Sequence, residues 1–138
     1  MSKLSSWSGR SLAEDLVAID LPDTITIACF NEGTLLGTAT YAERQDFVFI
    51  WGMYVHPNRL REGIGSLLIS TIARSVSPTS SMEVSVLTQS EKAIAFYRKL
   101  GFQTHKTENA EVFPEVVLLV NTMSCTAGTL KLPANRKP

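Results

Sequence analysis

The sequence predicts an α/β (α+β) fold in which a mixed, mostly antiparallel central sheet is flanked by helices. The first observation is that the hydrophobic period switches repeatedly between the alternation of a strand and the three-to-four-residue spacing of a helix. The second is composition: 44% hydrophobic and 19% charged residues are typical of a folded domain, not of a disordered chain. The third is length, because 138 residues make one domain that buries about 68–70% of its unfolded surface.

A short helix is expected near the N-terminus. Ser11 and Glu14 have the spacing of a capping box, and the apolar residues on one helical face behind it are Leu12, Leu16 and Ile19. Pro22 ends this helix, because proline lacks the N–H that a helix interior needs. The polar, Ser-rich residues 1–10 are expected to be loosely ordered.

Three strands follow this helix. Residues 24–30 and 34–41 alternate in hydropathy on either side of a turn at residues 31–33, which predicts a hairpin. Residues 47–55 are almost continuously apolar, as expected of a central strand that is covered on both faces. Pro57 then stops the strand.

Two helices alternate with the remaining strands. Apolar residues have helical spacing from Gly63 to Val76, and residues 82–87 alternate like a strand. A second helix is expected over residues 90–100, with Gly101 directly after its end. The last two strands are expected over residues 102–105 and 115–122. The single domain as a whole is expected to cover residues 11–125, and residues 126–138 are expected to form a polar, basic C-terminal tail.

The charge balance restricts the partners of the chain. Thirteen basic and thirteen acidic residues give zero net charge and a pI near 6.7, so no general field attracts nucleic acid or an anionic membrane, and any anion site must be local. No stretch approaches the ~18–20 apolar residues of a membrane span. Cys29 and Cys125 are expected to be reduced, packed thiols, and the protein is expected in the cytoplasm. His56 and His105 are isolated, so no metal site is expected.

The segment from Trp51 to Ser66 is the most informative for chemistry. A buried strand stops at a proline, and a short basic loop then runs through Gly63 and Gly65 into a helix. Two glycines two apart let the backbone approach a ligand, and the free N–H groups and the helix dipole favour an anion such as phosphate. The segment lacks the Gly-Lys-Ser/Thr of a nucleoside-triphosphatase loop, and Leu68 stands where a dinucleotide-binding motif needs glycine. Taken alone, it also fits an ordinary loop with solvated arginines.

The helix at residues 90–100 contains one unusual residue, Tyr97. It lies on or beside the apolar face, where a buried hydroxyl needs a hydrogen-bond partner. By itself this position indicates a structural tyrosine.

Together the two segments resemble the GNAT (Gcn5-related) N-acetyltransferases from Met53 to Phe102. In that family a loop of the form Arg/Gln-x-x-Gly-x-Gly/Ala binds the pyrophosphate of acetyl-CoA. Arg61 to Ser66 occupy this loop here, and Leu60 stands at its first position. The family then has Asn-x-x-Ala-x-x-x-Tyr followed by Gly-Phe, which in this sequence is Ser90, Ala93, Tyr97, Gly101 and Phe102.

The resemblance implies an acetyl-CoA-dependent N-acetyltransferase that moves an acetyl group directly to a primary amine in a ternary complex, without a metal. It implies Tyr97 as the general acid that protonates the departing thiolate. It also implies that acetyl-CoA is bound by Met53, Tyr54 and Val55 along the pantetheine arm, by Arg61, Glu62, Gly63, Ile64, Gly65 and Ser66 at the pyrophosphate, and by Ser90.

The sequence departs from the family pattern in three places. Leu60 replaces Arg or Gln, Ser90 replaces Asn, and a single expected helix replaces the strand and two helices that normally help to wall the acceptor site. The central strand has no Glu to act as base, and Ser85 stands where some relatives carry one. The remaining carboxylates are Glu43, Asp46, Glu83 and Glu111, and a water chain is the other option.

Two alternatives therefore stay open. One is a non-catalytic acyl-CoA-binding module or regulatory subunit. The other is a homodimer whose chains complete each other's acceptor site, with the tail after Thr126 and its Leu130 and Leu132 as a swapped arm. The acceptor is a small-molecule amine or a protein amine, and the sequence favours neither.

Overall fold

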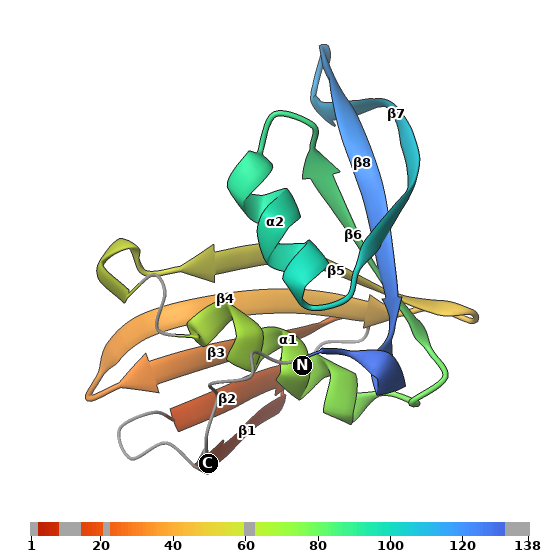
Figure 1. Ribbon diagram of the computed structural model, residues 1–138. Coiled ribbons are helices and arrows are strands. Elements are labelled where there is room, and N and C mark those ends of the chain that lie inside the picture. Colours follow the sequence, from red (N-terminus) through yellow and green to blue (C-terminus); the bar gives the residue numbers. More distant parts are fainter. Residues whose placement is uncertain (1–2, 9–14, 21–22, 60–62, 132–138) are drawn as a thin grey trace.

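The computed structural model describes residues 3–8, 15–20, 23–59 and 63–131. Within them one eight-stranded sheet has the order β1-β2-β3-β4-β5-β6-β8-β7, and two α-helices lie on one of its faces (Figure 1). The strands are β1 (Lys3–Ser8), β2 (Asp15–Asp20), β3 (Ile25–Asn31), β4 (Thr34–Glu43), β5 (Phe47–Val55), β6 (Ser81–Leu87), β7 (Gln103–Phe113) and β8 (Val116–Thr126). The helices are α1 (Ile64–Ser75), α2 (Glu91–Lys99) and the short 3-10 turns η1 (Pro57–Arg59) and η2 (Ala127–Thr129). The prediction of a mixed, mostly antiparallel sheet flanked by helices is confirmed.

The parallel pair of β5 and β6 divides the sheet into two halves. All other neighbouring strands are antiparallel, and α1 provides the crossover that a parallel pair requires. The pairing of β5 with β6 extends only over residues 47–50 and 81–84. Beyond it β5 continues along β4 and β6 continues along β8, so the two halves diverge, as Figure 1 shows.

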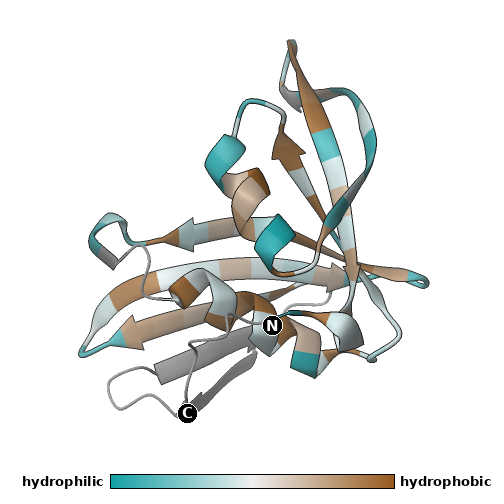
Figure 2. Ribbon diagram, in the orientation of Figure 1, coloured by the Kyte–Doolittle hydropathy of each residue, from teal (hydrophilic) through white to brown (hydrophobic). Residues whose placement is uncertain are grey.

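The core lies between the sheet and the two helices. Figure 2 shows hydrophobic residues along β3, β6 and α1. The largest side chains that are completely buried include Ile27, Leu36, Val48, Ile50, Ile64, Leu68, Ile69, Ile72, Met82, Leu100, Phe102 and Met123. The expected second helix and its ending residue are confirmed, because Gly101 has a φ of 106° directly after α2. Cys29 and Cys125 are buried free thiols, as expected.

The prediction for the N-terminal region is wrong. Residues 15–20, expected in a helix that begins at Ser11, form β2 and pair antiparallel with β3. The apolar residues fit a helical face and a strand alike; Val17 and Ile19 are β-branched, which favours the strand, and pairing covers an otherwise open edge of β3. Residues 3–8 form β1, although residues 1–10 were expected to be loosely ordered. Residues 11–14 lie outside the described part of the chain.

The C-terminal hairpin is longer than the sequence indicates. The strands expected over residues 102–105 and 115–122 are parts of β7 and β8, eleven residues each, which are joined at Pro114 and Glu115. The polar residues of β7 show no hydrophobic alternation because β7 is an edge strand exposed to water.

The first residues of the expected polar tail are part of the folded body. Ala127 is buried and Leu130 packs against the core. The N–H of Lys131 also donates to the carbonyl of Leu100 (2.8 Å). Leu132 lies outside the described residues. Among the helices that the structure describes, none is both long and apolar enough to cross a membrane.

Candidate active site

Strand β5 carries a bulge at the point where β6 leaves it. Trp51 opposes Thr40 and Tyr54 opposes Thr38, so both Gly52 and Met53 face a single residue of β4. Gly52 has a φ of 67°, which a residue with a side chain rarely adopts, and its carbonyl accepts a hydrogen bond from the Thr38 hydroxyl (3.3 Å).

The second half of β5 is consequently open on two sides. Past Ile50 no described strand pairs with its β6-facing edge, so the N–H and C=O groups between Trp51 and Val55 that point away from β4 are available to an extended ligand. The prediction that residues 47–55 are covered on both faces is wrong for this half, because Trp51 is 39% exposed and Tyr54 43%. The reason is that α1 and α2 pack on the same face of the sheet.

The N-terminus of α1 offers free backbone donors. Gly63 precedes the helix in a left-handed conformation (φ 84°), and the first helical hydrogen bond runs from the N–H of Leu67 to its carbonyl (2.9 Å). The N–H groups of Ile64, Gly65 and Ser66 therefore begin the helix without an acceptor within it. The Ile64 side chain is 1% exposed, so this residue can offer only its backbone to a ligand. With no acidic residue in the first turn, the dipole of α1 favours an anion here.

Gly65 packs against α2. A Cβ atom added to it would lie 3.0 and 3.1 Å from two ring carbons of Phe96, so the missing side chain lets the two helices approach. This contact brings the start of α1 next to the turn of α2 that carries Tyr97. Sequence reasoning assigned Gly65 to ligand approach alone and missed the packing contact, because nothing in the local pattern names the facing residue.

Tyr97 is buried among aromatic rings. It is 7% exposed and packs edge-to-face against Phe96 and Phe102, with ring centroids 5.0 and 5.2 Å away. Burial raises the pKa of its phenol to about 12, because the phenolate would lose its hydration. No hydrogen bond joins the Tyr97 hydroxyl to another described residue, so this hydroxyl can donate to a ligand.

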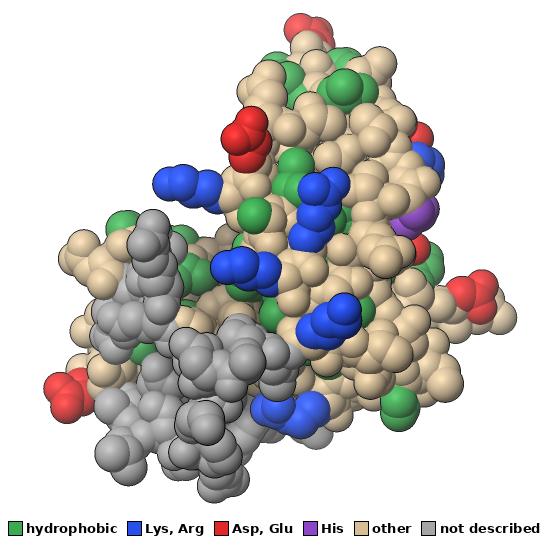
Figure 3. Space-filling view, in the orientation of Figure 1, with side chains coloured by type: hydrophobic (Ala, Val, Ile, Leu, Met, Phe, Trp, Pro, Cys, Tyr) green, Lys and Arg blue, Asp and Glu red, His purple; other side chains and the backbone are tan. Residues whose placement is uncertain are grey.

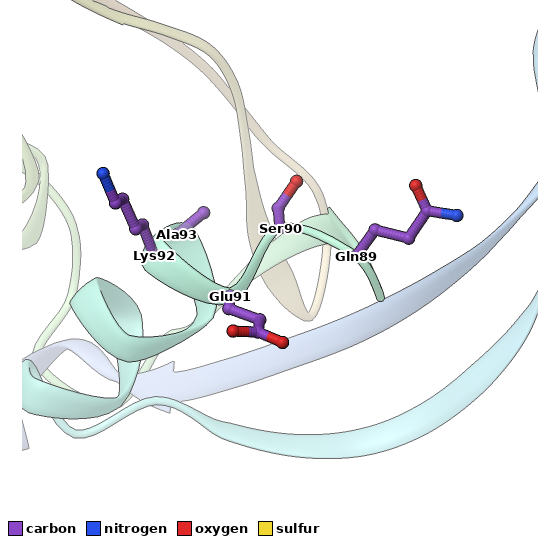
Figure 4. A pocket seen from close by; sticks show the side chains of 5 residues that line it. All are labelled: Gln89, Ser90, Glu91, Lys92 and Ala93. Carbon is purple, nitrogen blue, oxygen red and sulfur yellow. The ribbon is translucent and has the colours of Figure 1, made fainter.

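Ser90 stands directly before α2. Its N–H donates to the carbonyl of Leu87 and its carbonyl accepts from Ile94 (both 3.0 Å), while its side chain caps no helical N–H. Together with its neighbours it lines a hollow of about 500 Å³, whose lining residues are Gln89, Ser90, Glu91, Lys92 and Ala93. In Figure 4 the side chains of Ser90, Lys92 and Ala93 point to one side and that of Glu91 to the other.

The helix-bearing face is locally positive although the chain is neutral overall. Figure 3 shows Lys and Arg side chains gathered over this face. The exposed cations described on and near the helices are Arg74, Lys92, Arg98, Lys99 and Lys131. Glu91 is the one acidic residue of α2. The expectation that an anion site must be local fits this distribution.

The candidate bases do not converge on β5. Glu43, Asp46 and Glu111 are exposed, and the Glu111 carboxylate accepts a hydrogen bond from the N–H of Glu115 in the hairpin turn (2.7 Å). Glu83 is half-buried on β6 beside Phe49 of β5. Arg61 and Glu62, which the resemblance assigns to the pyrophosphate, lie outside the described residues, as does Leu60.

The chain thus combines a crossover helix that starts at a glycine with a parallel strand pair that diverges, and solved acetyltransferases share its fold. The model of the Acetyltransferase (GNAT) family matches residues 3–102, and the chain therefore belongs to the GNAT acetyltransferase family. The resemblance seen in the sequence is confirmed.

Three similar proteins illustrate how far the likeness extends. UPF0157 protein YqkA of Bacillus subtilis is 28% identical over 80 residues, which cover 58% of this chain and 23% of that protein, so the chain spans about a quarter of this curated relative's length. The ribosomal-protein-S18-alanine N-acetyltransferase of Escherichia coli superposes with a TM-score of 0.65 and 17% identity over 86% of this chain and 77% of that chain. The structure of yncA from Salmonella typhimurium, with its cofactor acetyl-CoA, superposes with a TM-score of 0.59 and 20% sequence identity. The superposition covers 75% of this chain and 65% of that chain. At these identities the likeness shows the fold.

Proposed function

We propose that this chain is an acetyl-CoA-dependent N-acetyltransferase that moves an acetyl group to a primary amine by direct transfer in a ternary complex. The observation that carries the proposal is the gap between β5 and β6. A bulged strand with free backbone groups borders it on one side, and the contact of Gly65 with Phe96 links the start of α1 to the turn of α2 that carries Tyr97.

The residues present fit acetyl-CoA as the acyl donor. The backbone N–H groups of Gly63, Ile64, Gly65 and Ser66, with those of Arg61 and Glu62 before them, would hold the pyrophosphate. The positive helix-bearing face attracts its phosphates. The open edge of β5 at Met53, Tyr54 and Val55 would pair with the amides of the pantetheine arm, and Ser90 would contact the arm from the start of α2.

Acetyl-CoA supplies an acetyl group activated as a thioester, whose carbonyl carbon bonds to the amine nitrogen while the carbon–sulfur bond breaks. This chain orients the thioester and stabilises charge. A backbone N–H at the bulge near Met53 would polarise the thioester carbonyl, a contribution of roughly 3–4 kcal/mol when one such donor is in place. The free N–H groups that a bulge leaves are suited to this role.

Tyr97 would donate a hydrogen bond to the departing sulfur. Its pKa of about 12 lies above the ~8.5 of a thiol in water, so complete proton transfer to the thiolate is uphill, even though burial beside Tyr97 would raise the pKa of the departing thiol as well. A hydrogen bond to a charged acceptor instead contributes about 1.5–3 kcal/mol. We therefore assign Tyr97 a donor role in which its own proton stays on the phenol, and solvent protonates the thiolate.

The test is acetyl-CoA binding by calorimetry followed by thiol release with a panel of amines. Binding with turnover supports the proposal. Binding without turnover supports the alternative, a non-catalytic acyl-CoA-binding module, which is favoured by the absence of a carboxylate on β5. If acetyl-CoA neither binds nor is turned over, both the proposed enzyme and the non-catalytic binding module are ruled out. We further propose the cytoplasm as the location, since the buried thiols Cys29 and Cys125 are free.

A further inference from the structure

The sheet face turned away from α1 and α2 also borders the gap between β5 and β6. A Cβ atom on Gly37 would meet Ile64 and Leu68 of α1, so Gly37 faces the helices and its neighbour Thr38 faces the other way. Cα partners on adjacent strands share a face, which places Trp51 beside Thr40 and Tyr54 beside Thr38 on this side. No described helix packs on this face. We call it the open face.

On the open face, two exposed aromatic side chains flank the β5 bulge. Six large hydrophobic side chains are exposed among the described residues, and four of them belong to the β7–β8 hairpin. Trp51 and Tyr54 are the other two, and they flank Gly52 and Met53. The Trp51 ring stacks on Phe49 at 5.6 Å with an interplanar angle of 28°, which holds it in place on the sheet. Exposed aromatic rings beside the position proposed for the thioester favour a flat, apolar ligand.

The polar groups around this surface are neutral or negative. The hydroxyls of Thr26 and Thr40 share a hydrogen bond of 2.9 Å beside Trp51. On β6, Glu83 pairs with Phe49 and therefore shares the open face with it. Further across, Lys106 and Glu108 form an ion pair (3.5 Å). Because Lys106 and Glu108 neutralise each other, the unpaired charge among these groups is the Glu83 carboxylate. Its sign is opposite to that of the positive helix-bearing face.

We propose that the acceptor is a primary amine carried on a flat apolar group, and that Trp51 and Tyr54 select this group on the open face. The inference rests on the proposed function, which puts the thioester at the gap. The flat group stacks on Trp51 and Tyr54, and Glu83 attracts the ammonium form. The ammonium loses a proton to water, the neutral nitrogen bonds to the acetyl carbon while the carbon–sulfur bond breaks, the nitrogen then gives up a second proton to water, and the sulfur takes one proton from solvent. The anionic donor thus approaches the positive helix-bearing face, and the cationic acceptor approaches the opposite face, which carries the Glu83 carboxylate.

Calorimetry with 2-phenylethylamine and propylamine tests the flat group separately from the amine. Both are primary monoamines, and each is titrated into the protein alone and into the CoA-saturated protein. We expect 2-phenylethylamine to bind about tenfold more tightly, which corresponds to about 1.4 kcal/mol. Trp51→Ala is expected to abolish this preference. Trp51→Phe retains a flat ring and keeps most of the preference, which also guards against loss of folding in the alanine variant.

Two further variants complete the experiment. Phe113→Ala is the matched control, because it removes an exposed aromatic ring from the hairpin tip, and the preference is expected to be unchanged. Glu83→Gln is expected to weaken both amines by about threefold, as for a partly exposed charge, without changing their ratio.

Equal binding of the two amines, or a preference that survives Trp51→Ala, would overturn the inference whether or not the protein turns over. The CoA titration separates this from the proposed function. If CoA does not bind while the aryl preference is present, the proposed function fails and the aromatic site stands. If CoA binds and the preference is absent, only the assignment of the acceptor fails.

Discussion

Replacing Tyr97 with Phe separates the chemistry of its hydroxyl from its packing. The phenyl ring keeps the edge-to-face contacts with Phe96 and Phe102, so the variant is expected to fold. The lost hydrogen bond to a developing thiolate, worth about 1.5–3 kcal/mol, corresponds to a fall in kcat of about 10- to 150-fold. The KM for acetyl-CoA is expected to change little, because the interaction forms mainly as the sulfur departs.

The same substitution has a signature in stability at alkaline pH. The folded protein raises the Tyr97 pKa from 10.0 to about 12, so the neutral phenol is favoured in the folded state. This contribution is complete below pH 10 and is lost as the pH rises from 10 to 12, by about 1.36 kcal/mol per pH unit and about 2.7 kcal/mol in total. The phenyl ring of Tyr97→Phe cannot ionise, so the variant lacks this contribution.

Two assays check this reasoning. Chemical denaturation at pH 9 and pH 11 measures the free energy of unfolding, and the wild type is expected to lose about 1.4 kcal/mol more than Tyr97→Phe between them. Thiol release from pH 7 to pH 9.5 measures kcat, and no fall in rate from Tyr97 ionisation is expected in that range. Parallel stability curves would refute the burial argument, and an unchanged kcat would remove Tyr97 from the mechanism.

Three other predictions concern the backbone around the site and the hairpin. Gly63→Asp is expected to abolish detectable acetyl-CoA binding in calorimetry. The control is Gly33→Asp in the β3–β4 turn, where the glycine has nearly the same φ (83° against 84°), and this variant is expected to keep binding. Equal losses in the two variants would show that backbone strain and not the anion site is responsible. Thr38→Val removes the hydrogen bond to the Gly52 carbonyl and is expected to lower kcat about three- to tenfold with an unchanged KM for acetyl-CoA. Thr38→Ser keeps a hydroxyl and is expected to restore kcat. If Thr38→Val were as active as the wild type, the bulge would need no such hydrogen bond. Glu115→Gly relieves a left-handed residue (φ 66°) in the β7–β8 turn and is expected to raise the free energy of unfolding by about 0.5–1 kcal/mol in urea denaturation, whereas a loss of stability would contradict it.

The central elements could be predicted because their local patterns agree with their tertiary surroundings. The strand at residues 82–87 buries Met82, Val84 and Val86 as its alternation indicates, and α1 begins directly after the glycine that the sequence places there. The strand β2 could not be predicted, because the spacing of its apolar residues fits a helix and the decision comes from pairing with β3. Propensity is a weak guide when a neighbouring edge needs a partner.

The candidate site shows the same division. The two motifs are local and therefore visible in the sequence. The exposure of Trp51 and Tyr54 is not, because an apolar run gives no sign of which face remains without a helix. The contact of Gly65 with Phe96 joins segments thirty residues apart in sequence, and only the folded chain pairs them.

The short ladder between residues 47–50 and 81–84 also has a mechanical consequence. It is the one hydrogen-bonded seam between strands of the two halves in the described chain. Packing also joins the halves, because α1 contacts η2 at the end of β8 as well as β3, β4 and β5, and Gly65 of α1 faces Phe96 of α2. A change in the width of the opening would therefore disturb this helix packing, and amide hydrogen exchange along the seam and α1 measures how strongly both resist it.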